Sequence, residues 1–194
     1  MEDLRLVACL GNPGMRYSLT RHNAGFWAGD ILARRHGVSF RNAGLFEVAR
    51  LPDGGPFLMK PMNYMNRSGK AVAALMNSRD ITHLEILVIS DDVNLELGRL
   101  RLRTSGSHGG HNGLRSVISE LDTSAFPRLR MGVGPAPVDE DLADFVLQNL
   151  PHDSEEEASS MAHRAADCVE RILEAGYNSA QTEFNRWDGG DDLE

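Results

Sequence analysis

The stretch Leu4-Arg5-Leu6-Val7-Ala8-Cys9-Leu10-Gly11-Asn12-Pro13-Gly14 decides how this chain begins to fold. Its apolar first half predicts a buried strand, and the glycine and proline residues that follow predict a turn that carries the chain out of a sheet. Apolar residues at helical spacing then predict a helix over Asn23–His36, which stops at Gly37. A strand, a loop and a helix in this order are the opening of an α/β domain.

A histidine, His22, lies where this helix begins, in the run Thr20-Arg21-His22-Asn23. The partial positive charge of a helix N-terminus disfavours the imidazolium form, so we expect the ring to stay neutral. A neutral ring is the form that a general base needs. The alternative is a polar cluster that caps the helix and includes a histidine by chance.

Strand and helix patterns alternate along the rest of the chain. Two strands, 46–51 and 57–60, flank the turn sequence Pro52-Asp53-Gly54-Gly55 and predict a hairpin. Further strands are predicted at 84–89, 99–103 and 129–133, and further helices at 68–76, 112–121, 141–150 and from a capping box at Ser154 and Glu157 to Gly176. The alternation predicts a single α/β domain with a twisted, mixed, largely parallel sheet and helices on both faces.

Length and composition fit one domain. The chain has 194 residues, of which 41% are hydrophobic and 25% charged. We expect residues 1–187 to form the domain and the acidic segment 188–194 to be disordered. The sequence lacks an apolar run long enough to span a membrane and starts with acidic residues, which argues against export. With two distant cysteines, Cys9 and Cys168, expected to be buried and reduced, it fits a cytoplasmic protein.

The net charge of −8 is distributed unevenly. Residues 1–132 hold 17 basic and 12 acidic residues, whereas residues 133–194 hold 3 and 16. One interpretation is simply a solvated acidic helix and tail. The other is that an anionic ligand engages the basic part of the domain.

Polar residues follow several predicted elements: Gly11-Asn12, Met65-Asn66, Ser90-Asp91-Asp92 and His111-Asn112. Ligands of such sheets bind beyond the carboxyl ends of the strands, so these ends predict one shared site. His22 and Asp91 form a candidate dyad, in which the carboxylate fixes the tautomer and the free ring nitrogen takes a proton from water. Alternatively, Asp91 only caps a neighbouring loop. No serine or cysteine has the context of a nucleophile, so we expect water to attack.

Three asparagines, Asn12, Asn66 and Asn112, offer amides that can hold a peptide backbone or stabilise an oxyanion. Asparagine is also common at turns for backbone reasons alone. Tyr17 and Tyr64 lie beside these loops, where a ring can stack on a base or simply cover the end of the sheet.

A glycine-rich loop spans Ser105–Gly113 and contains His108 and His111. It lacks the Lys-Ser/Thr ending of a P-loop, which argues against nucleoside triphosphates. The two histidines lack cysteine or carboxylate partners at metal-binding spacing, so we expect no metal there.

Arginines alternate along two predicted strands, at Arg99, Arg101 and Arg103 and at Arg128 and Arg130. The guanidinium group suits bidentate binding of phosphate, so adjacent basic strands predict a track for a nucleic-acid backbone. An ordinary solvated face is the alternative.

The chain resembles the bacterial-type peptidyl-tRNA hydrolase family over about residues 4–185. The segments that carry this resemblance are Leu10–Gly14, Tyr17–Phe26 (Y-S-L-T-R-H-N-A-G-F), Lys60–Gly69 (K-P-M-N-Y-M-N-R-S-G), Asp91–Gly98, Gly106–Ser116 (G-S-H-G-G-H-N-G-L-R-S) and Phe126–Gly134 (F-P-R-L-R-M-G-V-G). The resemblance implies hydrolysis of the ester that joins a peptide, or an N-blocked amino acid, to the 3′ ribose of tRNA, which recycles tRNA from aborted translation. It also implies a monomer without metal or organic cofactor.

The resemblance assigns roles to residues by their place in the motifs. His22 activates water, Asp91 orients it, and Asn12 helps to distinguish a blocked amino group from a free one. Asn66 and Asn112 hold the peptide or the water and polarise the ester carbonyl. The residues implied to line the site near the tRNA end are Tyr17, Tyr64, Met65 and His111. Arg103 and Arg130 are implied to clamp the 5′-phosphate of the acceptor stem.

The sequence departs from the family pattern at a few positions: Cys9 stands where glycine is common, Met62-Asn63 replace a more usual Xaa-Thr pair, and Ser90 stands where many relatives carry histidine or another polar residue. None removes a proposed catalytic group. Two alternatives stay open, a non-catalytic RNA-binding member of the same fold and a general esterase or aminopeptidase. The intact His22, Asp91 and asparagines favour the enzyme over the first, and the rows of arginine argue against the second.

Overall fold

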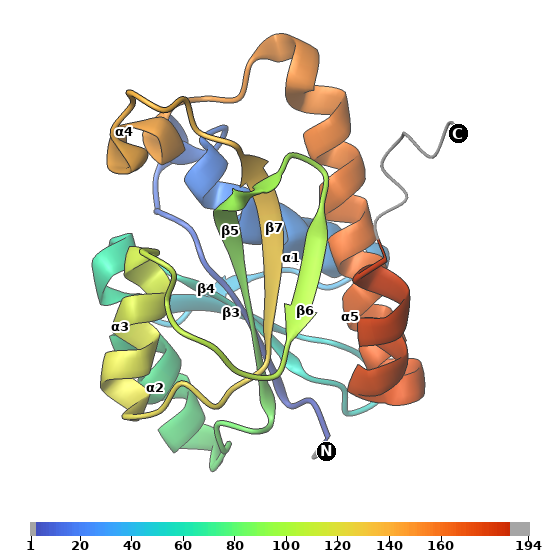
Figure 1. Cartoon of the computed structure of the whole chain (residues 1–194). Helices are drawn as coiled ribbons and strands as arrows, with labels where there is room; N and C mark the ends of the chain where they lie inside the picture. Colours follow the sequence, from blue (N-terminus) through green and yellow to red (C-terminus); the bar gives the residue numbers. More distant parts are fainter. Residues whose placement is uncertain (1–2, 187–194) are drawn as a thin grey trace.

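A computed structural model describes residues 3–186 as one seven-stranded sheet covered by helices (Figure 1). The strands are β1 (Leu6–Cys9), β2 (Arg41–Asn42), β3 (Phe46–Arg50), β4 (Phe57–Pro61), β5 (Ile86–Glu96), β6 (Leu100–Arg103) and β7 (Arg128–Gly134). They lie in the order β2-β3-β4-β1-β5-β7-β6. The opening strand therefore occupies the middle of the sheet.

The four central strands, β4, β1, β5 and β7, run parallel, and the outer ones are antiparallel. The predicted mixed, largely parallel sheet is confirmed. So is the predicted hairpin, which β3 and β4 form with Val48 opposite Met59. Strand β6 pairs with β7 alone and lies at the edge.

Helices cover both faces of the sheet. Helices α1 (Ala24–Arg35) and α5 (Glu155–Phe184) pack on one face, α2 (Ser68–Arg79) and α3 (Asn112–Leu121) on the other, and the short α4 (Leu142–Leu147) lies above the strand ends (Figure 1). Single turns of 3-10 helix, η1 (Met15–Tyr17), η2 (Arg21–Asn23), η3 (Met65–Arg67) and η4 (His152–Ser154), connect them.

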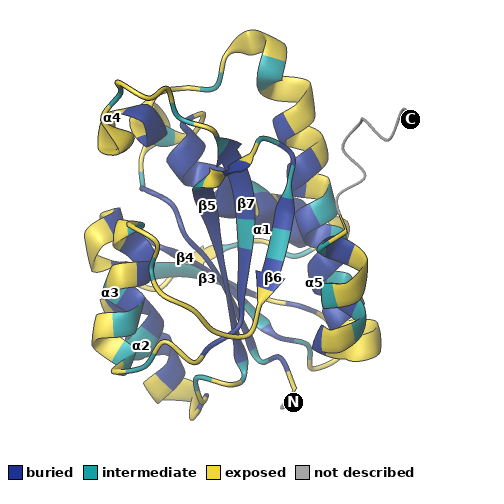
Figure 2. Cartoon of the chain, in the orientation of Figure 1, coloured by how far each residue is buried: buried dark blue, intermediate teal, exposed yellow. Residues whose placement is uncertain are grey.

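The continuous apolar runs of β1 and β5 follow from this two-sided burial (Figure 2). Val7 and Leu87 belong to the core beneath α1 and α5, while Leu6 and Val88 belong to the core beneath α2 and α3. Successive side chains of a strand point to opposite faces, so both sets must be apolar.

Strand β5 is longer than the sequence pattern predicted. It continues beyond Ile89 to Glu96, because β7 keeps pairing with it through Asp91↔Met131 and Asp92↔Gly132. The two carboxylates therefore belong to the strand itself, where the prediction placed them in the loop after it. A paired backbone holds their side chains more firmly than a loop does.

Three features of the helix ends also differ from prediction. Ser154 makes no side-chain cap, and its hydroxyl donates to Asp153 instead. Gly176 kinks α5 with φ +78°, and the chain continues helically to Phe184. Helix α4 stops at Leu147, before the predicted end at Leu150, because Gln148 is extended and Asn149 bridges to Thr20.

Cys9 and Cys168 are free and fully buried, as predicted. Burial raises the pKa of both thiols to about 12, so they stay protonated and unreactive. No helix within residues 3–186 is long and apolar enough to cross a membrane. The acidic segment 188–194 lies outside the described residues.

Gly25 sets how closely α1 approaches the strand ends. A Cβ atom there would lie 2.5 Å from the carbonyl oxygen of Leu10 and 2.7 Å from that of Ile89. We predict that Gly25→Ala lowers the free energy of unfolding by about 1–3 kcal/mol, the usual range for overpacking, as measured by urea denaturation.

Gly54→Ala is the matched control. Gly54 has φ +78° and open space around its Cβ position, so only backbone strain of about 1 kcal/mol is expected. A smaller loss for Gly25→Ala than for Gly54→Ala would contradict the close approach.

Candidate functional site

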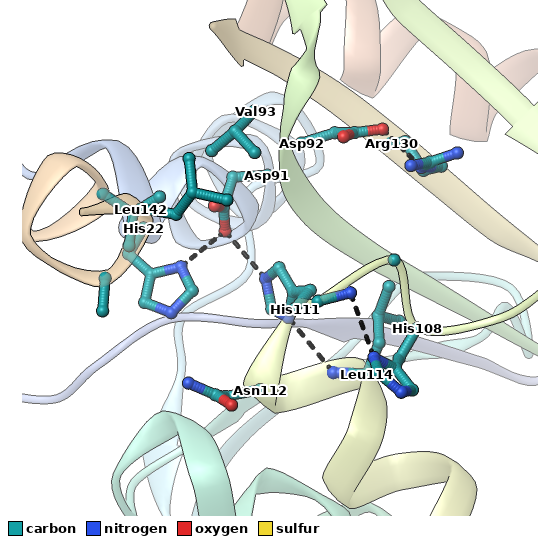
Figure 3. A pocket seen from close by; sticks show the side chains of 14 residues that line it. His22, Asp91, Asp92, Val93, His108, His111, Asn112, Leu114, Arg130 and Leu142 are labelled. Atoms are coloured by element: carbon teal, nitrogen blue, oxygen red, sulfur yellow. Dashed lines mark hydrogen bonds and ion pairs between the residues drawn. The ribbon is translucent and has the colours of Figure 1, made fainter. Parts of the chain in front are cut away.

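The centre of the site is the buried carboxylate of Asp91, which pairs with two histidines (Figure 3). Its Oδ1 lies 2.9 Å from Nδ1 of His22 and 2.9 Å from Nε2 of His111. Asp91 is only 3% exposed. A buried carboxylate requires donors, and the two rings supply them.

The two histidines come from opposite faces of the sheet. His22 lies in η2, which leads directly into α1, whereas His111 immediately precedes α3. Their rings meet at Asp91, in the middle of β5, with centroids 4.8 Å apart. The site therefore forms where β5, η2 and the glycine-rich loop converge. The predicted contact between His22 and Asp91 is confirmed.

The hydrogen bonds of each ring define its tautomer. Nδ1 of His111 accepts from the backbone N–H groups of Gly113 and Leu114, at 3.0 and 3.1 Å, and so caps α3. Its Nε2 must then carry the proton that it donates to Asp91. Nδ1 of His22 donates to the same carboxylate, which leaves Nε2 of the neutral ring, with no hydrogen-bond partner among residues 3–186, as the nitrogen that can accept a proton.

The electrostatic environment of His22 differs from the sequence-based prediction. Burial disfavours the charged ring, but the charge of Asp91 and its hydrogen bond outweigh this effect and raise the pKa of His22. The helix start was expected to lower this pKa, and the direction is the opposite. Burial likewise opposes the carboxylate of Asp91, yet the two histidines hold its pKa well below the usual value.

His22, Asp91 and His111 also have the composition of a metal site, with ligand atoms within 4.8 Å of one another. The hydrogen bonds of His111 do not suit a metal ion. Its Nδ1 is engaged by two helix N–H groups, so coordination through Nε2 requires loss of the Nε2 proton and an anionic ring. This donor set fits a proton-transfer site better than a metal centre.

Asn12 is held rigidly beside this centre. Its backbone N–H donates to Oδ1 of Asn23 at 2.8 Å, and its carbonyl accepts from Nδ2 of Asn23 at 3.0 Å. The side-chain oxygen of Asn12 accepts from the N–H of Met65 at 2.9 Å. Because its oxygen is engaged, the amide of Asn12 is oriented with Nδ2 as its remaining donor.

A pocket of about 100 Å³ extends from His22 to Arg130. Of the predicted residues, those that line it are His22, Asp91, His111, Asn112 and Arg130. Its other wall comes from α4, through Leu142, Ala143 and Val146. The predicted Asn12, Asn66, Met65, Tyr17, Tyr64 and Arg103 do not line this pocket.

These remaining residues lie on neighbouring segments. Met65 packs against α3, where a Cβ on Gly113 would come within 2.5 Å of its sulfur. Asn66 is exposed in η3, and Tyr64 just before it is 55% exposed. Tyr17 is half-buried in η1, beneath the guanidinium of Arg16 at 4.5 Å.

The predicted row of arginines is present in part. Arg101 and Arg130 lie opposite each other on β6 and β7, as do Arg103 and Arg128. Arg103 is exposed, but Arg128 is 1% exposed and cannot reach a ligand. Its inclusion in a phosphate track is therefore wrong.

Arg128 instead anchors the glycine-rich loop from below. Its guanidinium donates to the carbonyl oxygens of Gly106 at 2.7 Å, Ser107 at 3.1 Å and Ser124 at 2.7 Å. Burial, followed by the nearby charge of Arg130, lowers its pKa to about 10, so it stays charged at neutral pH. The arginine thus fixes the segment that leads to His111.

Three structural partners of the site were not anticipated: Asn23, Arg128 and Arg21. The guanidinium of Arg21 lies 4.2 Å from the ring of Phe145 and donates to the carbonyl of Asn149, which ties α4 to the residue next to His22. His111 was expected as a substrate contact, and its bond to Asp91 was not foreseen. Its position directly before a predicted helix was the available signal, since that is where capping side chains lie.

Comparisons with known proteins agree with this geometry. The family model described as peptidyl-tRNA hydrolase matches residues 6–191. A peptidyl-tRNA hydrolase of Chloroflexus aurantiacus is 45% identical over 186 residues, covering 93% of this chain and 98% of its own length. That of Mycobacterium tuberculosis is 40% identical over 191 residues, covering 96% and 100%. The crystal structure of peptidyl-tRNA hydrolase from Acinetobacter baumannii superposes with a TM-score of 0.90 at 33% identity, covering 96% of this chain and 97% of the other.

The pKa of His22 tests the role of Asp91. We predict that Asp91→Asn lowers this pKa below the ordinary value of histidine, because burial remains while the stabilising charge is gone. NMR titration of the His22 ring measures it, with Asp153→Asn at an exposed position as control. An unchanged pKa in Asp91→Asn would show that the carboxylate does not act on this ring.

Proposed function

Because this chain belongs to the peptidyl-tRNA hydrolase family, we propose that its pocket hydrolyses the ester between a peptide, or an N-blocked amino acid, and the 3′ ribose of tRNA. The observation that carries the proposal is the orientation of His22. Its Nδ1 is engaged by Asp91, and its Nε2 is free to accept a proton.

The reaction begins at Nε2 of His22, which takes a proton from water as the water oxygen attacks the ester carbonyl carbon. A tetrahedral oxyanion forms, and Asp91 stabilises the imidazolium. When the bond to the ribose oxygen breaks, His22 returns the proton to that oxygen. The products are the free peptide acid and tRNA, and the histidine is neutral again.

The asparagines are proposed to orient the substrate. Asn112 lines the pocket and is placed to donate to the developing oxyanion or to hold the attacking water. Asn66, exposed on η3, is proposed to hold the peptide. The free Nδ2 donor of Asn12 matches the carbonyl oxygen of a blocked amino group, whereas a free ammonium group offers it no acceptor.

The tRNA itself is proposed to bind along the arginines of β6 and β7. Arg103 and Arg130 are assigned to the 5′-phosphate of the acceptor stem, while Tyr17, Tyr64, Met65 and His111 are assigned to the region near the tRNA 3′ end. We also propose that the protein acts as a monomer in the cytoplasm, where peptidyl-tRNA arises.

The non-catalytic RNA-binding alternative is not favoured. A binding protein has no need for a base whose tautomer is fixed by a buried carboxylate. The curated relatives are also named as hydrolases over nearly the whole chain.

His22→Ala is expected to abolish deacylation of N-acetyl-aminoacyl-tRNA while the protein still folds, because it removes the base of the proposed reaction. The release of labelled amino acid measures the rate, and circular dichroism checks the fold. His152→Ala is the control, since that side chain is 96% exposed. Wild-type protein should leave free aminoacyl-tRNA largely intact. Near-normal turnover by His22→Ala would refute the mechanism, and cleavage of neither substrate by wild-type protein would favour the binding-protein alternative.

Arg103→Ala and Arg130→Ala are expected mainly to raise KM, since these residues are assigned to phosphate and lie away from the ester. Each should also reduce the slope of log K against log salt by about one, the contribution of one phosphate contact. Arg41→Ala removes the same charge at the opposite edge of the sheet and serves as control. A salt slope unchanged in both variants rules out the phosphate clamp.

A further inference from the structure

The arginines of β6 and β7 that are proposed to bind tRNA, here called the arginine site, include Arg101, Arg103 and Arg130. Beside them lies a buried carboxylate that the proposed reaction does not use. Arg101 is surrounded by Arg103, Arg99 and Arg130, and these charges, after burial, lower its pKa, while Asp92 acts in the opposite direction. Asp92 is 6% exposed and lies at the arginine end of the pocket, away from His22 (Figure 3). A negative charge placed among groups that bind phosphate works against that binding.

The contacts of Asp92 are unequal at its two oxygens. Oδ1 accepts from the backbone N–H and the side-chain amide of Asn94, at 3.0 and 3.3 Å, which fixes the carboxylate in place. Oδ2 lies 2.5 Å from Nε of Arg130, yet within the described residues it accepts no hydrogen bond. The ion pair therefore rests on charge and proximity, without an aligned N–H donor.

We propose that Asp92 competes with tRNA phosphate for Arg130 and thereby limits the affinity of the arginine site. This inference rests on the proposed function, in which Arg130 receives a phosphate. The side chain of Arg130 is 26% exposed, so its planar fork is accessible from the pocket. A phosphate offers it aligned, bidentate acceptors that Oδ2 does not. Once Arg130 turns to phosphate, Asp92 is left buried with less compensation and close to a second anion.

Competition between Asp92 and tRNA phosphate for Arg130 would speed the release of tRNA after the reaction. A hydrolase that recycles tRNA must release it, and product release often limits the rate of an enzyme. An internal carboxylate that regains Arg130 as tRNA departs favours release. A purely orienting role for Asp92, in which it holds Arg130 ready for phosphate, has the opposite consequence, because its loss would then weaken binding.

Asp92→Asn separates these two roles. The amide is the same size, and its oxygen can still accept from Asn94, so the fold is preserved while the charge is removed. We expect deacylated tRNA to bind roughly fivefold more tightly, the upper end for a partly exposed ion pair. The slope of log K against log salt should become steeper by up to about one, because Arg130 is fully available to phosphate.

Two comparisons isolate the effect. Asp53→Asn changes the net charge equally, at an exposed turn residue with φ +54° that asparagine tolerates, and should leave binding within the error of wild type. In the Arg130→Gln background, Asp92→Asn should give little or no gain, because the competition requires both partners. Binding to tRNA with and without its 5′-phosphate identifies which phosphate Arg130 receives.

The outcomes are distinct. Tighter binding and a steeper salt slope in Asp92→Asn, lost in the Arg130→Gln background, support the competition. If Asp92→Asn binds as wild type or more weakly while Arg130→Gln weakens binding, the competition is overturned and the phosphate clamp stands. If Arg130→Gln leaves tRNA binding unchanged, the clamp itself fails.

Discussion

The constraint on which this site depends is the burial of the Asp91 carboxylate within the paired strand β5. Burial makes the ionised form costly unless donors surround it, and the two histidines meet this need from opposite faces of the sheet. The result is a histidine, His22, whose tautomer is fixed by the fold. Because His111 is locked by the N-terminus of α3, it donates to Asp91 and His22 remains the ring with a free nitrogen. One carboxylate thus assigns different roles to two identical side chains.

The precision of that arrangement comes from backbone packing at some distance from the carboxylate. Gly25 lets the start of α1 approach the carbonyl groups at the ends of β1 and β5, which determines where His22 lies. On the other face, the buried guanidinium of Arg128 gathers the carbonyl groups of the glycine-rich loop, which determines where His111 lies. The glycines make the loop Ser105–Gly113 flexible, and the hydrogen bonds of Arg128 hold its backbone in one position.

The sequence predicted the sheet class, the hairpin and the pairing of His22 with Asp91, because these follow from local patterns and from the rule for strand ends. It could not predict the length of β5, since Ser90, Asp91 and Asp92 resemble a loop until β7 is known to pair with them. The sequence assigned Arg128 and Arg130 to the same phosphate-binding face, because they alternate along one strand. Alternation cannot show that one end of that face, at Arg128, is buried. The pKa of His22 was misjudged for a similar reason. The helix start is visible in the sequence, but the nearer and stronger charge of Asp91 arrives through tertiary contact.

Asp91 and Asp92 show how one strand end can serve two chemical purposes. Adjacent residues of a strand point to opposite faces, so the first carboxylate meets the histidines while the second meets Arg130. The first is stabilised by aligned N–H donors and is thereby committed to its partners. Within the described part of the chain, the second retains an oxygen that accepts no hydrogen bond, next to a guanidinium that is accessible from the pocket. The proposed proton transfer relies on the fixed geometry of the first carboxylate, and the proposed binding of tRNA phosphate relies on the second carboxylate giving up its partner Arg130.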